Sequence, residues 1–262
     1  MAPRARIPSF TSQRVAATYS TSAKMRRTSP IKTQMAIINW ENVLVPMDWM
    51  VMHLGLGNSA DSTQQAVIRC RRSPGLLRDM AAIEERIMLL LTEAMQSIKG
   101  PVVITSEYST VFIEYISSLF FPRLTTALRN ATTGIYVVGT PYTMLTEVEL
   151  STWKANLMHT AIFEKLFAGT DYSKTQCLLA SEKIGIIALC ARETDVTATS
   201  AAYTIARNAI IKRVKVKAAK APCAKHPLGS PIPLQDFHAQ LQSLTLFVKQ
   251  AAVSNHPIGI NL

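Results

Sequence analysis

The residue types that most often carry chemistry are present in this chain, but their spacing fits no familiar catalytic motif. The four cysteines are scattered without a Cys-x-x-Cys pair, and the five histidines show no metal-ligand spacing with cysteines or acids. This spacing argues against a zinc knuckle or a disulfide framework and is typical of a reducing compartment. Ser181 stands in no Gly-x-Ser-x-Gly motif, so a hydrolase triad has little support.

Polar residues at the ends of short apolar runs are more informative candidates. They are Asn39 and Glu41 at the end of 35–39, Thr105 and Ser106 in 101–106, and Ser181 in 176–181. In a parallel α/β sheet, ligands bind beyond the carboxyl ends of the strands. These side chains are therefore the ones that a common site would bring together.

The elements that must position them follow from apolar runs that alternate with amphipathic stretches. We expect buried strands at 35–39, 101–106, 134–140, 176–181 and 209–217. We expect helices at 73–98, 110–120, 147–167, 183–191 and 233–254. The alternation predicts an α/β fold, a Rossmann-like parallel sheet with helices on both faces. One sheet should bury Ile37, Ile38, Val103, Ile104, Val137, Val138, Leu178 and Leu179.

Length and composition allow one large domain. The chain has 262 residues, of which 48% are hydrophobic, so it can bury a sizeable core without disulfides. No apolar run approaches the roughly 20 residues that span a bilayer, and we expect no membrane partner. We divide the chain into an extended basic arm at 1–34 and an α/β domain at 35–262, with a helical insertion at about 50–99.

The net charge of +11 is concentrated in two segments without acids, 1–34 and 196–235, each with seven basic residues. Such a distribution favours docking on a polyanion, either RNA, an acidic lipid surface or an acidic protein such as tubulin, although it can also serve solubility alone. The run 207–225 has no aromatic residue, so it predicts binding to charge rather than to bases. The expected contacts are Arg4, Arg6, Arg14, Lys24, Arg26, Arg27, Lys32, Lys212, Arg213, Lys215, Lys217 and Lys220.

Residues 1–34 cannot bury enough apolar surface to fold alone. Their Arg- and Ser-rich composition without acids has two interpretations. One is a mitochondrial presequence, and the other is a permanent arm that threads along a partner. We expect the retained arm and keep the presequence as the alternative.

Several short motifs resemble the haloacid dehalogenase superfamily, in particular a protist-type subgroup with a WDDTLLP-like first motif. The resemblance covers about residues 35–262, including the basic strand 210–217 and the final helix. The similar segments are INWENVLVPMDWM (38–50), ITS (104–106), TWK (152–154) and LLASE (178–182). The resemblance implies a haloacid-dehalogenase-like fold and phosphatase ancestry.

Departures from the family's pattern imply that catalysis is lost. Asn39 stands where the family has the aspartate that attacks phosphorus, and an amide is a very poor nucleophile. Glu41 stands at the general acid and base position, and Val43 replaces a threonine. Ser181, followed by Glu182, stands where the resemblance places metal-binding acids, so we expect neither a metal nor a cofactor.

Three residues of the matching positions keep groups that could touch phosphate. Thr105 and Ser106 offer hydroxyls and Lys154 a cation, as the family's motifs would have it. In the other interpretation these residues have only structural roles. A hydroxyl then caps the chain locally, and Lys154 pairs with an acid such as Glu41.

The sequence thus predicts an inactive haloacid-dehalogenase-like protein that is a structural component of a large acidic assembly. The favoured assembly is an axonemal doublet microtubule of a cilium or flagellum, with tubulin and neighbouring axonemal proteins as partners in the cytoplasm and cytoskeleton. The first alternative is a mitochondrial ribosome, where the partner is ribosomal RNA. The second is an active phosphatase of the same family.

Overall fold

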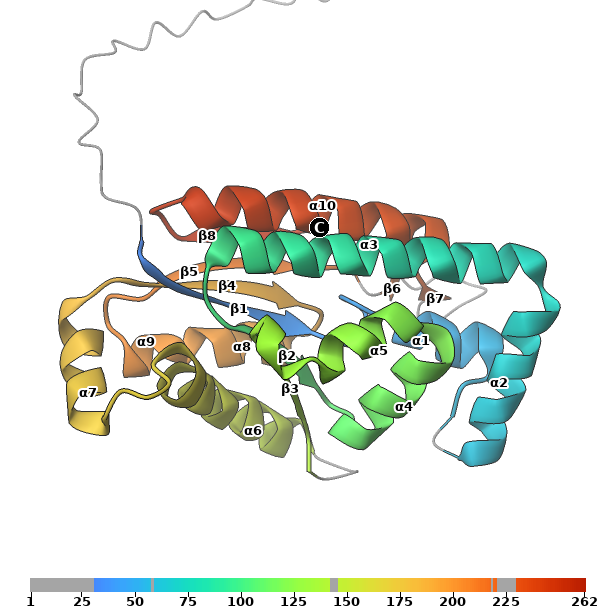
Figure 1. Ribbon diagram of the computed structural model, residues 1–262, viewed down its shortest axis with the longest axis horizontal. Helices are drawn as coiled ribbons and strands as arrows, with labels where there is room; N and C mark the ends of the chain where they lie inside the picture. The colour runs from blue at the N-terminus through green and yellow to red at the C-terminus, as the bar shows by residue number, and fades with distance from the viewer. Residues whose placement is uncertain (1–30, 58, 142–145, 218, 221–229) are drawn as a thin grey trace, which may run out of the picture.

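Within the described part of the chain, six strands form one parallel sheet in the order β3-β2-β1-β4-β5-β8 (Figure 1). The computed structural model describes residues 31–57, 59–141, 146–217, 219, 220 and 230–262. The strands are β1 (Thr33–Asn39), β2 (Val102–Ser106), β3 (Ile135–Gly139), β4 (Ile184–Cys190), β5 (Ile210–Lys215) and β8 (Ile258–Asn261). The order is that of a Rossmann-like fold, and the expected α/β class is confirmed.

Helices connect the strands and cover both faces of the sheet (Figure 1). The α-helices are α1 (Met47–Trp49), α2 (Ala60–Arg72), α3 (Pro74–Ile98), α4 (Thr110–Phe120), α5 (Pro122–Arg129), α6 (Glu147–Thr160), α7 (Tyr172–Ser181), α8 (Glu193–Ser200), α9 (Ala202–Ile205) and α10 (Leu234–Val253). Two short π-helical turns are η1 (Met50–Leu54) and η3 (Ala161–Leu166), and one 3₁₀ turn is η2 (Ala131–Thr133). A short antiparallel pair joins β6 (Ala219–Lys220) to β7 (Ser230–Pro231).

Alternate side chains of the central strands pack into two different hydrophobic cores, one on each face of the sheet. In β1, Ala36 and Ile38 join the cluster that contains α3 and α10, whereas Met35 belongs to the cluster under α6, η3 and α7. Side chains of a strand alternate between its faces, so a strand covered on both sides must be apolar throughout. This double burial explains why β2 and β4 are entirely buried.

The fourth strand is not where the sequence predicted it. Residues 172–181 form helix α7, and the expected helix 183–191 is instead β4. Leu178 and Leu179 therefore leave the predicted sheet core and lie on α7. In α7 only Thr175 and Leu179 are buried, which is helical spacing. Every residue of β4 is buried, because this central strand contributes side chains to both core clusters.

The other long elements agree with the sequence prediction. Helix α3 begins after Ser73, whose side chain accepts a hydrogen bond from the Leu76 amide, and the chain leaves it through Lys99 in a left-handed conformation. Residues 1–30 of the expected arm lie outside the described residues, and Thr33 and Gln34 belong to β1. No helix in the described ranges has the length and apolar character that a membrane crossing requires.

Candidate functional site

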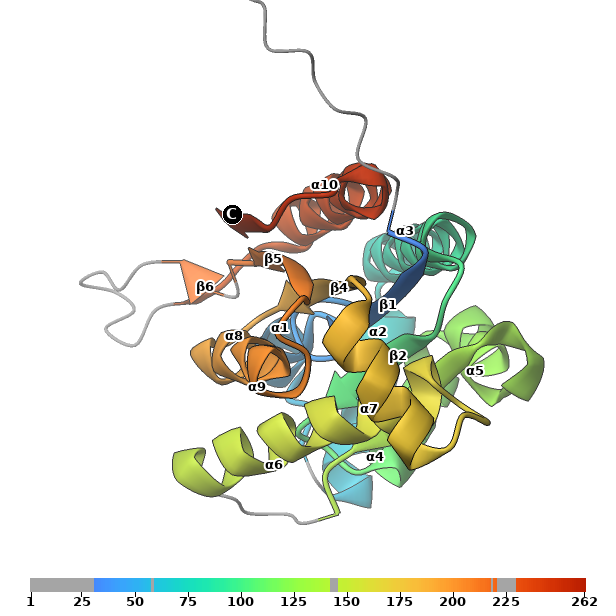
Figure 2. The same cartoon turned by 90° about the vertical axis from the view of Figure 1, so that its left-hand side faces the viewer.

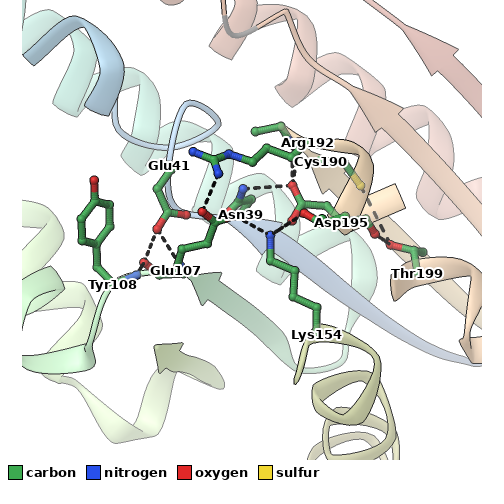
Figure 3. A network of polar contacts seen from close by, with 12 residues as sticks. Asn39, Glu41, Glu107, Tyr108, Lys154, Cys190, Arg192, Asp195 and Thr199 are labelled. Carbon is green, nitrogen blue, oxygen red and sulfur yellow. Dashed lines mark hydrogen bonds and ion pairs between the residues drawn. The ribbon is translucent and has the colours of Figure 1, made fainter. Parts of the chain in front are cut away.

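The carboxyl edge of the sheet brings polar side chains from several elements together (Figure 3). Asn39 ends β1 and Ser106 ends β2. Lys154 comes from α6, and Asp195 comes from the first turn of α8, just beyond β4. Because β1 and β4 are the neighbours at which the strand order changes direction, this edge is where an open α/β sheet binds ligands.

Asp195 is the centre of this network, and the sequence analysis missed it. Its Oδ2 accepts hydrogen bonds from Asn39 Nδ2 at 3.0 Å and from the amides of Ala191 and Arg192, both at 2.9 Å. The carboxylate therefore lies at the start of α8, where a helix favours negative charge. Once β4 is placed at 184–190, Asp195 is the first acid after that strand that is also buried. The sequence analysis was therefore wrong to place Ser181 and Glu182 after the fourth strand, because that strand is followed instead by the turn that leads to Asp195.

Lys154 is held by carboxylates on both sides. Its buried Nζ donates to Asp195 Oδ1 at 2.5 Å, to Glu107 Oε1 at 2.8 Å and to Thr194 Oγ1 at 3.1 Å. Burial by itself lowers the pKa of Lys154, but the two carboxylates outweigh it and hold that pKa above its ordinary value. The acids that pair with this lysine are Asp195 and Glu107, and not Glu41 as the structural alternative suggested.

Glu107 pairs with a second cation besides Lys154, and the loop that carries it packs closely against the backbone at the end of β3. Its Oε2 forms an ion pair of 2.7 Å with Arg192, whose side chain is half-exposed. The loop that carries Glu107 crosses the end of β3 at Gly139, where a Cβ would lie 2.3 Å from the Tyr108 carbonyl oxygen. Two carboxylates and two cations thus neutralise one another across the sheet edge.

Glu41 is a fifth ionisable group, and it lies deeper. Its Oε1 accepts hydrogen bonds from Ser106 Oγ and, at 2.7 Å, from the Glu107 amide. Its Oε2 has no partner among the described residues. Burial is the largest cause that raises the pKa of Glu41 to about 7, because the charged form loses its hydration. Glu41 is therefore largely protonated in mildly acidic solution.

The side chain of Asn39 is hydrogen-bonded within the protein and borders only a small cavity. Its Nδ2 is bound to Asp195, while its Oδ1 has no partner in the described chain. The adjoining cavity has a volume of about 20 Å³ and is lined by Asn39, Thr105, Lys154 and Asp195 together with apolar side chains. A space of this size holds about one water molecule.

The remaining candidates fall elsewhere. Ser181 is exposed at the end of α7 and precedes β4, so it lies at the amino edge, opposite the network. Its Oγ donates to the Cys177 carbonyl oxygen at 2.8 Å. Val43 is fully buried in the core. Ser181 and Glu182 are therefore not the residues that follow the fourth strand.

Lys212 was expected on a basic surface and is instead fully buried. Its Nζ donates to the Ala251 carbonyl oxygen at 2.6 Å and to Gln34 Oε1 at 3.1 Å. Burial lowers the pKa of Lys212 to about 8. It shares the apolar face of β5 with Val214, because residues two apart on a strand point the same way. Lys212 offers no contact to a polyanion.

The other basic residues that the structure describes differ in exposure and in their partners. Lys32 and Lys217 are exposed. Arg213 donates to Ser200 Oγ at 3.0 Å, and Lys215 pairs with Glu193. Lys220 lies in β6, and its side chain is outside the described residues. Arg4, Arg6, Arg14, Lys24, Arg26 and Arg27 lie there as well.

No protein-family model, curated protein or solved structure matches the chain. In the residues that the structure describes, no three His, Cys, Asp or Glu side chains gather as a metal site would need. The chemistry of the site therefore rests on its own geometry, which is that of a closed and internally neutralised polar network.

Proposed function

We propose that this chain is a haloacid-dehalogenase-like domain without phosphatase activity that acts as a structural component of a large acidic assembly. The observation that carries the proposal is that the chain's own side chains fill the carboxyl edge of the sheet, where the family's reaction centre would lie. Asn39 binds Asp195, and the three hydrogen bonds of Lys154 in the described chain all go to internal acceptors.

The chemistry of this arrangement supports loss of turnover. A phosphoryl transfer through a side chain at position 39 needs an anionic oxygen, which the amide of Asn39 does not supply. A phosphate that approached Lys154 would also meet the carboxylates of Asp195 and Glu107, which already use this cation. Like charges at such distances repel strongly in a buried site.

The assembly partner is proposed from charge. The acid-free basic segments, most of which lie outside the described residues, favour an acidic surface. We propose tubulin in an axonemal doublet microtubule as that surface, with ribosomal RNA as the competing partner. Apolar residues of the arm, among them Ile7, Phe10 and Tyr19, favour a protein surface because they add contacts that salt does not screen.

Activity is tested by hydrolysis of an aryl phosphate by the full chain, with and without Mg²⁺. We expect no turnover above the buffer rate. Turnover that disappears in Asn39→Ala would contradict the proposal and favour an active phosphatase.

Docking is tested by co-sedimentation with microtubules, and separately with structured RNA, across a salt series. The variant to compare with the full chain lacks residues 1–30, a deletion that leaves the buried Ile31 and strand β1 intact. We expect the full chain to bind microtubules and the deletion variant to lose that binding with unchanged urea stability. Binding only to RNA, with an affinity that falls by orders of magnitude as salt rises, would favour the ribosome instead.

A further inference from the structure

A second cavity in the described part of the chain shares no lining residue with the cavity at the carboxyl-edge network. Its volume is about 650 Å³, and it is lined by residues of α6, η3, α7, α9 and the turn before β5. Figure 2 faces α7 and α9, with α6 beneath them. We call this space the α7–α9 groove. Its size falls within the range of pockets that hold small organic ligands.

One wall of the α7–α9 groove is a stack of three aromatic rings. The ring centroids of His159 and Phe163 are 4.3 Å apart with planes at 19°, and those of Phe163 and Tyr172 are 5.0 Å apart at 21°. Phe163, the middle ring, belongs to the π-helical turn η3. Such turns are rare in proteins, and those that occur are often found at functional sites. Both faces of Phe163 are covered by its neighbours in the stack, so a flat ligand meets the ring edges along this wall and the outer face of the exposed Tyr172.

The charge of the α7–α9 groove is positive, because no acidic residue lines it and Arg207 does. The exposed guanidinium of Arg207 has no hydrogen bond or ion pair within the described residues, in contrast to Lys154. Gln176 adds an amide and Thr204 a hydroxyl to the lining. A guanidinium binds carboxylates and phosphates with paired hydrogen bonds.

Contacts within the protein join the walls of the α7–α9 groove to one another and to the core. Asn208 Nδ2 donates to the Ala180 carbonyl oxygen at 3.1 Å, which joins the turn before β5 to the end of α7. Leu179 is buried beneath the groove as part of the core. A preformed pocket spares a ligand the cost of ordering its own site.

We propose that the α7–α9 groove binds a planar aromatic ligand that carries an anionic group, as a nucleotide does, with the ring on Tyr172 at the end of the His159–Phe163–Tyr172 stack and the anion at Arg207. This binding is independent of the docking function proposed above. The same chemistry has two sources, a free nucleotide and a nucleotide within single-stranded RNA. Tertiary structure supplies the aromatic residues that the basic run beginning at Arg207 lacks in sequence.

The test is titration calorimetry of the full chain with adenosine monophosphate, inorganic phosphate and adenosine. We expect saturable binding of adenosine monophosphate, at least tenfold tighter than that of either fragment. Arg207→Gln and Tyr172→Ala should each weaken it at least tenfold, and both replace exposed side chains. Lys174→Gln, an exposed position of α7 outside the groove, is the matched control and should bind like the parent chain.

A second titration distinguishes the source. Tighter binding of a six-nucleotide RNA, displaced by adenosine monophosphate, indicates a polymer, whereas binding of the free nucleotide alone indicates a small ligand. The absence of saturable binding to both would overturn the proposal, as would equal weakening by Arg207→Gln and Lys174→Gln. Microtubule co-sedimentation of the Tyr172→Ala variant, whose residue lies in the groove and outside both basic segments, should remain unchanged, so failure of the groove and failure of the docking function are separate results.

Discussion

The two edges of the sheet differ in how their polar groups are used. At the carboxyl edge, Lys154 is closed between two carboxylates beside a cavity of about 20 Å³. Towards the amino edge, Arg207 is without a partner in the described chain and lines a groove of about 650 Å³. The difference teaches that polar residues at the usual ligand-binding edge of this fold can be used up by contacts with one another. An open groove with an unpaired cation can then lie near the opposite edge.

The largest effect should come from breaking the closed edge. Lys154→Met leaves Asp195 and Glu107 without their buried cation, and we expect a loss of about 3–5 kcal/mol in the free energy of unfolding. Urea denaturation of this variant and of Lys174→Met, an exposed lysine, provides the comparison. The surface change should stay within about 0.5 kcal/mol. Equal, small losses in both variants would mean that the network contributes nothing to stability.

The second effect is the pH dependence that Glu41 imposes. Its folded pKa of about 7 lies above the ordinary 4.5, so between these values the folded state binds more protons than the unfolded state. Stability should therefore fall as pH rises from about 4.5 to 7, by about 3 kcal/mol at 1.4 kcal/mol per pKa unit. Above pH 7 this contribution is constant.

Glu41→Gln should remove this slope and make the variant the more stable protein at pH 8. The matched control is Glu182→Gln, an exposed carboxyl that should leave the slope in place. Urea midpoints measured between pH 4.5 and 8 decide the matter. The same slope in Glu41→Gln as in the parent chain would show that another group titrates.

A third effect tests how far the closed edge is from a metal site. Asn39→Asp replaces a donor to Asp195 by a second carboxylate, and we expect a loss of about 1–3 kcal/mol in the presence of a chelator. Mg²⁺ should reverse much of that loss, because it binds paired carboxylate oxygens, and should leave the parent chain unchanged. Urea denaturation with and without Mg²⁺ measures both. Because Asp195 is present, this variant is also the one in which phosphatase activity should be sought.

The smallest effect concerns accessibility and leaves stability unchanged. Cys190 lines the closed cavity, and burial raises its pKa to about 12, so its thiol should resist a maleimide at pH 8. Cys177 is exposed on α7 and should react within minutes. Peptide mass spectrometry after labelling separates the two sites. Labelling of both at similar rates would mean that the carboxyl edge opens readily.

The sequence predicted the long elements well because their periodicity is local. The helices at 73–98 and 233–254 and the strands at 35–39 and 101–106 each carry enough apolar residues at regular spacing to be recognised. The short segments 172–181 and 184–190 were exchanged, because neither is long enough for periodicity to separate a helix from a buried strand. That one exchange moved the predicted end of the fourth strand from Cys190 to Ser181, and so it hid Asp195 as a candidate.

The sequence by itself determined the α/β alternation and the positions of Asn39, Glu41, Thr105 and Lys154 at strand ends or on a following helix. Only the tertiary structure decided that Asp195 holds Asn39, that Lys212 is buried, and that three aromatic rings line one groove with Arg207. The physical reason is that local pattern sets which face of an element is apolar. The partner of a polar side chain depends instead on strand register and helix packing, which join residues far apart in the chain.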